Sequence, residues 1–253
     1  MAATRAFTIL ALVASLMSPV RAEDMDSCGE ASYFPSEYTC YDNSTLCPIT
    51  FNLPTVPCEG AGGCYASEMF SCKDGELETL PEATGPFTLT AHGMRPAYQN
   101  LTVKACGNYL AIGANARECT SCAGAGPDVQ CESYRNNTVL LPNGKMSVDV
   151  PGGQYWYVDP NNGLLQYTAD GNSTAIKWAG HNVTVYEDGF FVYDSMPHYW
   201  LACLRTLPGG VPGTGRTYRI YASTFSNLES GDCEPIRLAT KSVDKTEGAY
   251  KYL

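Results

Sequence analysis

Histidine is scarce in this chain, which has only His92, His181 and His198 among its 253 residues. No Gly-x-Ser-x-Gly motif is present, and every cysteine can be assigned to a disulfide, so no catalytic nucleophile stands out. A Ser-His-Asp triad, whose members lie far apart in a sequence, is the less favoured alternative. The 26 acidic residues show no paired array of the kind that glycosidases use. We therefore expect no catalytic residues and no enzyme activity.

Basic residues and long apolar runs are also few. The 16 Lys and Arg against 26 Asp and Glu give a net charge of −10, so nucleic acids are not expected as partners. The apolar run from Ala6 to Met17 is shorter than the roughly 20 residues that span a bilayer. No hydrophobic tail follows Gly248, and we expect no membrane anchor.

Residues 1–22 instead have the pattern of a secretory signal peptide. Arg5 precedes the apolar run, and Val20-Arg21-Ala22 forms a small-x-small cleavage site. The protein is therefore predicted to be secreted, either free outside the cell or retained in a cell wall. In a secreted chain each Asn-x-Ser/Thr sequon is a candidate surface glycosylation site. The sequons begin at Asn43, Asn100, Asn136, Asn172 and Asn182.

Cysteines, in contrast, are abundant, and an even number in the oxidising secretory route most often forms disulfides. They fall into three even clusters, so each cluster can pair within itself, although spacing does not choose the connectivity. Cys119-x-x-Cys122 could also be half a zinc site or a redox pair, but two disulfides are favoured, and we expect no metal or cofactor. The 12 cysteines are Cys28, Cys40, Cys47, Cys58, Cys64 and Cys72, then Cys106, Cys119, Cys122 and Cys131, then Cys203 and Cys233.

The composition changes near residue 75 and divides the chain in two. Residues 23–74 are cysteine-rich and too few to fold on an apolar core alone, so disulfides must stabilise them. Residues 75–86 are polar and contain Pro and Gly, as in a linker. Residues 87–253 show strand periodicity and no amphipathic helix of ten residues. We predict a small disulfide-rich module followed by an all-β domain, either a sandwich or a barrel, with a trefoil-like duplication left open.

Within the second domain the alternation of apolar and polar residues predicts individual strands. Residues 87–91 and 146–150 alternate with period two. A turn at residues 159–163 is expected to join strands at 154–158 and 164–168. The clearest hairpin is predicted over residues 183–193, around the turn residues Asp188-Gly189.

The cysteine-rich segment also carries many aromatic side chains beside polar ones. Flat aromatic faces stack on the C–H patches of sugar rings, while carboxylate and amide groups bond the hydroxyls. A disulfide framework would hold such groups rigidly and reduce the entropy lost on binding. The alternative is that the same rings form the miniature core of the segment. The candidate carbohydrate-binding residues are Tyr33, Tyr38, Tyr41, Asp42, Tyr65 and Phe70.

This segment resembles the fungal carbohydrate-binding module of family 52, which occurs in endo-1,3(4)-β-glucanases and in small secreted wall proteins. The resemblance rests on Tyr38-Thr39-Cys40-Tyr41-Asp42, on Leu46-Cys47-Pro48, and on Cys64-Tyr65 with Phe70-x-Cys72. Phe70 stands where a Tyr is commoner, and residues 59–63 lengthen a loop. The resemblance implies binding of wall polysaccharide, most directly β-1,3-glucan, and implies nothing about catalysis.

The second domain resembles, more loosely, fungal secreted cell-wall proteins of the phialide-protein (PhiA-like) type. The shared residues include Pro151-Gly152-Gly153-Gln154 and Leu201-Ala202-Cys203. Because these are strand and turn residues, they support a shared fold more than a shared function. The resemblance implies that Cys203 and Cys233 staple the last strands, and that the cysteines from 106 to 131 brace an irregular loop.

Together these features predict a non-catalytic, secreted or wall-associated glycoprotein that binds cell-wall β-glucan. One alternative is a glycoside hydrolase or accessory enzyme whose site lies in the second domain. Another is a structural wall protein or an effector that the module only localises. The sequence leaves the oligomeric state open.

Overall fold

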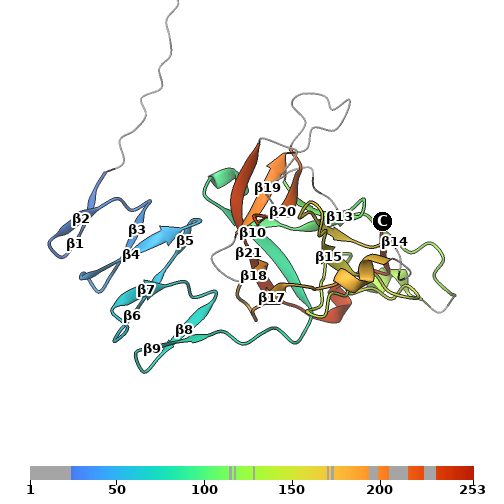
Figure 1. Ribbon diagram of the computed structural model, residues 1–253, viewed down its shortest axis with the longest axis horizontal. Coiled ribbons are helices and arrows are strands. Elements are labelled where there is room, and N and C mark those ends of the chain that lie inside the picture. The colour runs from blue at the N-terminus through green and yellow to red at the C-terminus, as the bar shows by residue number, and fades with distance from the viewer. Residues whose placement is uncertain are drawn as a thin grey trace, which may run out of the picture.

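The computed structural model describes residues 24–253, except residues 114, 115, 117, 128, 170, 172, 173, 194–198, 205–215 and 225–231. Across this part of the chain the regular structure consists of strands and short 3-10 helices (Figure 1). The prediction of a disulfide-rich module followed by an all-β domain is confirmed. No described helix is long and apolar enough to cross a membrane. The predicted signal peptide and Asn172 lie outside the described residues.

The N-terminal module, residues 26–80, is made of short antiparallel strands. One of them lies inside the segment expected to be a linker, and its pairing with the preceding strand extends the module to Thr79. The strands are β1 (Asp26–Cys28), β2 (Ala31–Tyr33), β3 (Tyr38–Tyr41), β4 (Thr45–Thr50), β5 (Leu53–Pro54), β6 (Val56–Cys58), β7 (Gly63–Tyr65), β8 (Phe70–Lys73) and β9 (Glu76–Thr79).

The module contains two copies of one structural unit. In copy 1, residues 26–49, β1 pairs with β2 and β3 pairs with β4. In copy 2, residues 56–80, β6 pairs with β7 and β8 pairs with β9. Cys28 and Cys58 end the first strands of the two copies, and Cys40 and Cys72 lie in their third strands. The two copies therefore follow the same path through two successive hairpins.

The turn between the hairpins also repeats and fixes which residues are equivalent. In copy 1 the Phe34 carbonyl accepts hydrogen bonds from the amides three and four residues later, and the second of these is Tyr38 (3.1 Å). In copy 2 the Ala66 carbonyl accepts the same pair of bonds, and the second donor is Phe70 (3.1 Å). Tyr38 and Phe70 therefore occupy equivalent positions in the two copies.

Each copy is closed by its own disulfide, and a third disulfide joins the copies. The pairing of the six cysteines within their cluster is confirmed, and the structure supplies the connectivity that the spacing left open. Cys28–Cys40 ties β1 to β3, Cys58–Cys72 ties β6 to β8, and Cys47–Cys64 crosses from β4 to β7.

A close backbone approach recurs in both copies and requires glycine. A Cβ at Gly29 would lie 3.0 Å from the carbonyl oxygen of Asn43, and a Cβ at Gly60 would lie 2.9 Å from the Cα of Gly75. Both Gly29 and Gly60 also have positive φ, 61° and 100°. In each copy the turn of the second hairpin thus packs directly on the turn of the first.

The β domain, residues 82–253, is built on a sheet of nine antiparallel strands with the order β11-β10-β21-β19-β20-β13-β16-β15, and β12 pairs with β13. These strands are β10 (Phe87–Gly93), β11 (Leu101–Thr102), β12 (Lys104–Cys106), β13 (Tyr109–Ile112), β15 (Trp156–Val158), β16 (Leu165–Tyr167), β19 (Trp200–Leu204), β20 (Tyr218–Ala222) and β21 (Cys233–Ser242). The separate pairs are β14 (Thr120–Ser121) with β22 (Lys251–Tyr252), and β17 (Val183–Val185) with β18 (Phe191–Tyr193). The hairpins expected at residues 154–168 and 183–193 are confirmed.

Isolated bridges continue the pairing beyond β15 and close the sheet on itself. Lys145 bridges Tyr155, Met146 bridges Leu140, and Leu140 bridges Phe87 of β10. This closure corresponds to the barrel alternative. The prediction of a strand at residues 146–150 is wrong. The chain leaves the sheet there, because the backbone amides of residues 149 and 150 donate to the carbonyl of residue 250.

The core of the β domain combines aliphatic side chains with a cluster of aromatic ones. Phe191 contacts both Trp156 and Trp200, with ring centroids 5.2 Å apart in each pair, and all three side chains are at most 2% exposed. Tyr167 of β16 and Tyr252 of β22 are also buried in this core. Burial raises the pKa of Tyr167 to about 12. Burial raises the pKa of Tyr252 as well.

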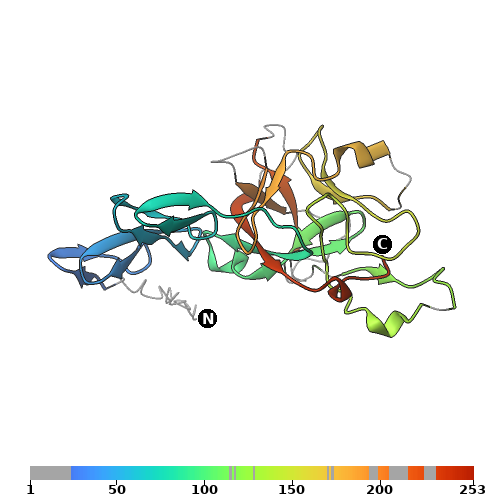
Figure 2. The same cartoon turned by 90° about the horizontal axis from the view of Figure 1, so that it is seen from below.

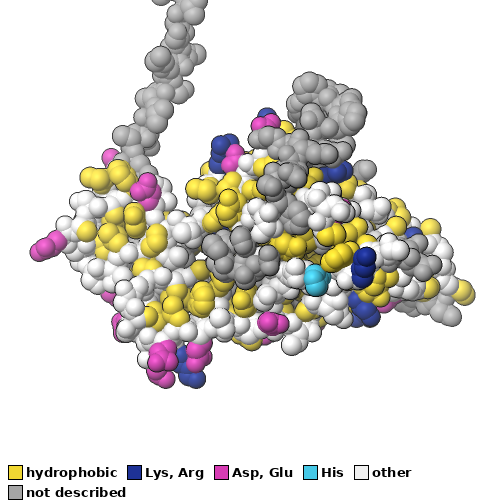
Figure 3. Space-filling model, viewed as in Figure 1, with side chains coloured by type: hydrophobic (Ala, Val, Ile, Leu, Met, Phe, Trp, Pro, Cys, Tyr) yellow, Lys and Arg dark blue, Asp and Glu magenta, His cyan; other side chains and the backbone are white. Residues whose placement is uncertain are grey.

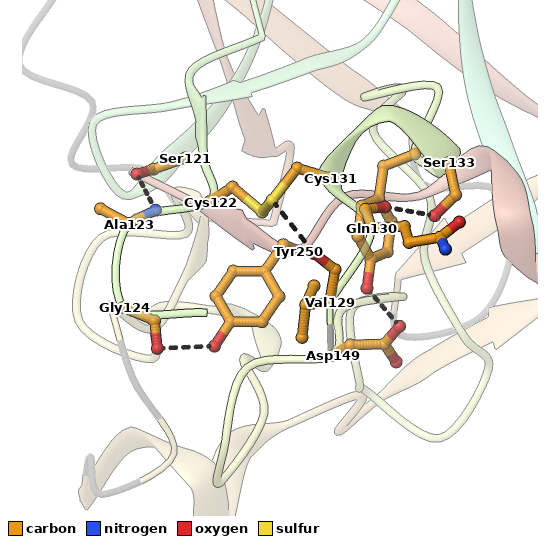
Figure 4. Close-up of a disulfide and its surroundings, with 11 residues drawn as sticks. Ser121, Cys122, Ala123, Gly124, Val129, Gln130, Cys131, Ser133, Asp149 and Tyr250 are labelled. Carbon is orange, nitrogen blue, oxygen red and sulfur yellow. Dashed lines mark hydrogen bonds between the residues drawn. A yellow bond between two sulfur atoms is a disulfide. The ribbon is translucent and has the colours of Figure 1, made fainter. Parts of the chain in front are cut away.

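Three further disulfides brace this domain, and they again pair within their clusters. Cys106–Cys119 and Cys122–Cys131 hold the irregular loop, and Cys203–Cys233 joins directly paired residues of β19 and β21. The two thiols of Cys119-x-x-Cys122 thus belong to different disulfides. Figure 4 shows the Cys122–Cys131 bond beside Tyr250, whose hydroxyl donates to the Gly124 carbonyl (3.4 Å) and ties the loop to the C-terminal segment.

Copy 2 packs against the β domain (Figure 2). Met69 is 3% exposed and lies in one apolar cluster with Phe190 and Val192, and Phe70 packs on the same cluster. The Phe190 amide donates to the Glu68 carbonyl (2.9 Å). The turn between β17 and β18 therefore fills the face of copy 2 on which Met69 and Phe70 lie.

Candidate functional site

In copy 1, the face equivalent to the Met69 and Phe70 face of copy 2 lines a hollow of about 370 Å³. Tyr38 takes the place of Phe70 and is 39% exposed, and Glu37 takes the place of Met69 and is also exposed. The hollow is lined by Ser36, Glu37, Tyr38, Pro48, Ile49, Phe51, Asn52 and Met94. Small-molecule pockets in proteins typically have volumes of about 300–1,000 Å³.

The hollow lies at the junction, and the β domain supplies part of its lining. Met94, which follows β10, is 64% exposed and is the lining residue that comes from the β domain. The Asn52 side chain reaches this segment from the module, and its Nδ2 donates to the carbonyls of Gly93 (2.9 Å) and Met94 (3.1 Å). In the opposite direction, the side-chain Nε2 of Gln99 in the β domain donates to the backbone carbonyl of Phe51 in the module (2.9 Å). These bonds fix Met94 relative to copy 1.

Phe51 connects the hollow to the interior of the junction. Its ring lies 5.0 Å from the guanidinium of Arg237 and 6.3 Å from the ring of Tyr199. Burial lowers the pKa of Arg237, and the nearby Glu68 carboxylate partly offsets this effect. The β domain therefore contacts Phe51, a lining residue of the hollow, through Arg237 and Tyr199.

The structure places the six candidate binding residues in three kinds of environment. Tyr38 lines the hollow. The Tyr41 hydroxyl donates to the Thr55 carbonyl inside the module (3.0 Å), and Phe70 packs on the junction cluster, so both side chains have structural contacts. Tyr33 and Tyr65 are half-buried at equivalent positions of β2 and β7, and Asp42 lies exposed in the β3–β4 turn with a φ of 49°.

Some residues of the hollow were absent from the candidate set. Phe51 and Asn52 form the turn between β4 and β5 with φ of 54° and 55°, and this turn carried no aromatic-cysteine motif in the sequence. Met94 belongs to the other domain, so only the folded structure brings it to the module. Phe34, 40% exposed, flanks the same turn as Tyr38. Figure 3 shows hydrophobic side chains exposed on the module and acidic side chains around its edge.

The predicted glycosylation sites can also be placed. Four of the five sequon asparagines are described, and all four are exposed with positive φ, as expected of turn positions on the surface: Asn43, Asn100, Asn136 and Asn182. Among the described residues, no group of three or more His, Cys, Asp or Glu side chains could hold a metal ion.

Comparison with known proteins assigns a class to the module. A family model described as carbohydrate binding matches residues 27–77, which span almost the whole module and both copies of its repeated unit. The N-terminal module is therefore a carbohydrate-binding domain. No curated protein and no solved structure matches the chain.

Proposed function

We propose that this protein is a non-catalytic, secreted or wall-associated protein that binds cell-wall polysaccharide through its N-terminal module, with β-1,3-glucan as the first ligand to test. The observation that carries the proposal is the coincidence of the carbohydrate-binding match at residues 27–77 with an exposed Tyr38 ring over a polar-edged hollow. The choice of β-1,3-glucan is supported by the resemblance to the fungal family 52 module.

The chemistry of the hollow supports a neutral glycan in particular. The Tyr38 ring offers an apolar face for sugar C–H groups, and the Glu37 carboxylate offers acceptor oxygens to sugar hydroxyl groups. The Glu37 carboxylate and a net charge of −10 oppose acidic polysaccharides. Neutral glucan fits this combination of rings and acceptors.

The function is tested by depletion of the mature, full-length protein on insoluble β-1,3-glucan, cellulose and chitin. The expected result is saturable retention on β-1,3-glucan without release of reducing sugar. Release of reducing sugar would contradict the non-catalytic assignment. Stronger retention on chitin or cellulose would identify that polysaccharide as the ligand in place of β-1,3-glucan. No retention on any of the three would contradict the proposed function.

A further inference from the structure

The two copies of the repeated unit present the same face to two different surroundings. On copy 2, the Glu68 carbonyl accepts the Phe190 amide, and Met69 packs on the Phe190 side chain. A Cβ at Gly189 would come within 2.3 Å of the Glu68 carbonyl oxygen, so the β17–β18 turn fits this face without a gap. The face thus accommodates a segment of chain that combines a flat apolar group with a hydrogen-bond donor.

On copy 1 the equivalent face lines the hollow. Tyr38 replaces Phe70 there, which adds a hydroxyl group, and Glu37 replaces Met69, which exchanges a buried thioether for an exposed carboxylate. These replacements suit a ligand with hydroxyl groups better than a protein turn. The described residue that the β domain adds to this hollow is Met94.

We propose that the hollow between copy 1 and the β domain is a composite glycan subsite, in which Tyr38 from the module and Met94 from the β domain contact opposite parts of the same run of neutral sugar residues. This inference rests on the proposed function and deepens it, because it gives the β domain a share in the binding site. Met94 adapts to the ligand surface, as unbranched thioether side chains do. Asn52 is a positioning residue, since its Nδ2 donates to the Gly93 and Met94 carbonyls and fixes the Met94 segment.

The proposal predicts that a substitution in the β domain, outside the region matched to the carbohydrate-binding family, weakens glycan binding. The test uses the full-length protein and Met94→Arg, with Met25→Arg as the matched control. Met25 is 60% exposed and Met94 is 64% exposed, but only Met94 lines the hollow. Both variants keep an exposed backbone position and add the same charge, so their folding should be comparable, and thermal unfolding checks this.

Binding is measured as the dissociation constant on particulate β-1,3-glucan. Met94→Arg and Tyr38→Ala are each expected to weaken binding by about tenfold or more, and Met25→Arg by less than twofold. If the unchanged protein binds but Met94→Arg and Met25→Arg bind equally well, the composite site is wrong and the proposed function stands. If Tyr38→Ala weakens binding and Met94→Arg does not, the site belongs to the module alone and the inference is overturned. Absence of binding by the unchanged protein would overturn both.

Discussion

The side-chain amide of Asn52 donates a hydrogen bond across the domain junction to the carbonyl of Met94, 42 residues further along the chain (3.1 Å). The same Nδ2 donates to the Gly93 carbonyl (2.9 Å). One residue of the module thus satisfies two backbone acceptors of the β domain beside the hollow. The junction is therefore held both by this polar contact on the side of copy 1 and by the apolar cluster on the side of copy 2.

Replacing Asn52 with Asp tests the polar contact. The substitution removes both Nδ2 donors and places a carboxylate beside two carbonyls, while Asp tolerates the positive φ of 55° at this position. We expect a loss of about 1 kcal/mol in the free energy of unfolding and weaker retention on glucan. Chemical denaturation and the glucan isotherm measure the two effects. Unchanged values of both would show that Asn52 does not hold the Met94 segment.

The apolar cluster predicts that equivalent positions of the two copies respond differently to truncation. Met69→Ala removes a side chain that is 3% exposed and should lower the free energy of unfolding by about 2–4 kcal/mol. Glu37→Ala, at the equivalent exposed position of copy 1, should change it by less than about 0.5 kcal/mol. Equal effects in denaturation experiments would contradict the assignment of copy 2 as the copy that docks on the β domain.

The disulfide pattern predicts local rather than global loss of order in copy 1. Replacing both Cys28 and Cys40 with Ser removes the bond that closes a loop of 12 residues, which in the loop-entropy model costs about 3 kcal/mol. Cys47–Cys64 and Cys58–Cys72 still hold copy 2 and its docking. Limited proteolysis followed by mass spectrometry should place new cleavages near residues 26–45. Cleavages concentrated in the β domain would contradict this account.

The buried tyrosines predict loss of stability in alkali. An unfolded tyrosine ionises near pH 10, whereas burial raises the pKa of Tyr167 to about 12 in the folded protein. Between these values the unfolded state binds fewer protons, so this contribution to stability is complete below pH 10 and is lost as the pH rises toward 12. Melting temperatures from pH 8 to 11.5 should therefore fall most steeply above pH 10.

Tyr167→Phe is the control for this pH dependence. The variant loses the hydrogen bond that the Tyr167 hydroxyl donates to the Leu253 carbonyl, so its melting temperature at pH 8 should be lower. Its decline above pH 10 should be shallower because one buried titrating group is gone. An alkaline decline as steep as that of the unchanged protein would exclude Tyr167 as a contributor.

Local sequence patterns were enough to predict the class of fold, and of the six candidate binding residues they included one that lines the hollow, Tyr38. Cysteine clustering predicted which thiols pair among themselves, and alternation with turn residues predicted the hairpin at residues 183–193, because both depend on neighbours in the chain. The duplication was also visible in principle, since Tyr38-Thr39-Cys40-Tyr41-Asp42 and Phe70-Ser71-Cys72-Lys73-Asp74 share an aromatic-hydroxyl-Cys-x-Asp pattern.

Features that depend on tertiary contacts could not be predicted in this way. Phe70 and Tyr38 look alike as exposed ring candidates in the sequence, and only the docking of Phe190 separates their environments. Met94 carries no local signal at all, because its relation to the hollow arises from hydrogen bonds between residues more than 40 positions apart. The strand expected at residues 146–150 failed for a similar reason, since a pairing with residues 249–250 draws the chain away.

The most direct test of the central claim is the binding isotherm of the mature protein on particulate β-1,3-glucan, measured beside Tyr38→Ala and Leu77→Ala. Both side chains are exposed on the module, 39% and 45%, but only Tyr38 lines the hollow. The account predicts saturable binding that Leu77→Ala retains and that Tyr38→Ala weakens by about tenfold, or about 1.4 kcal/mol. Equal binding by the two variants, or no binding by the unchanged protein, would contradict it.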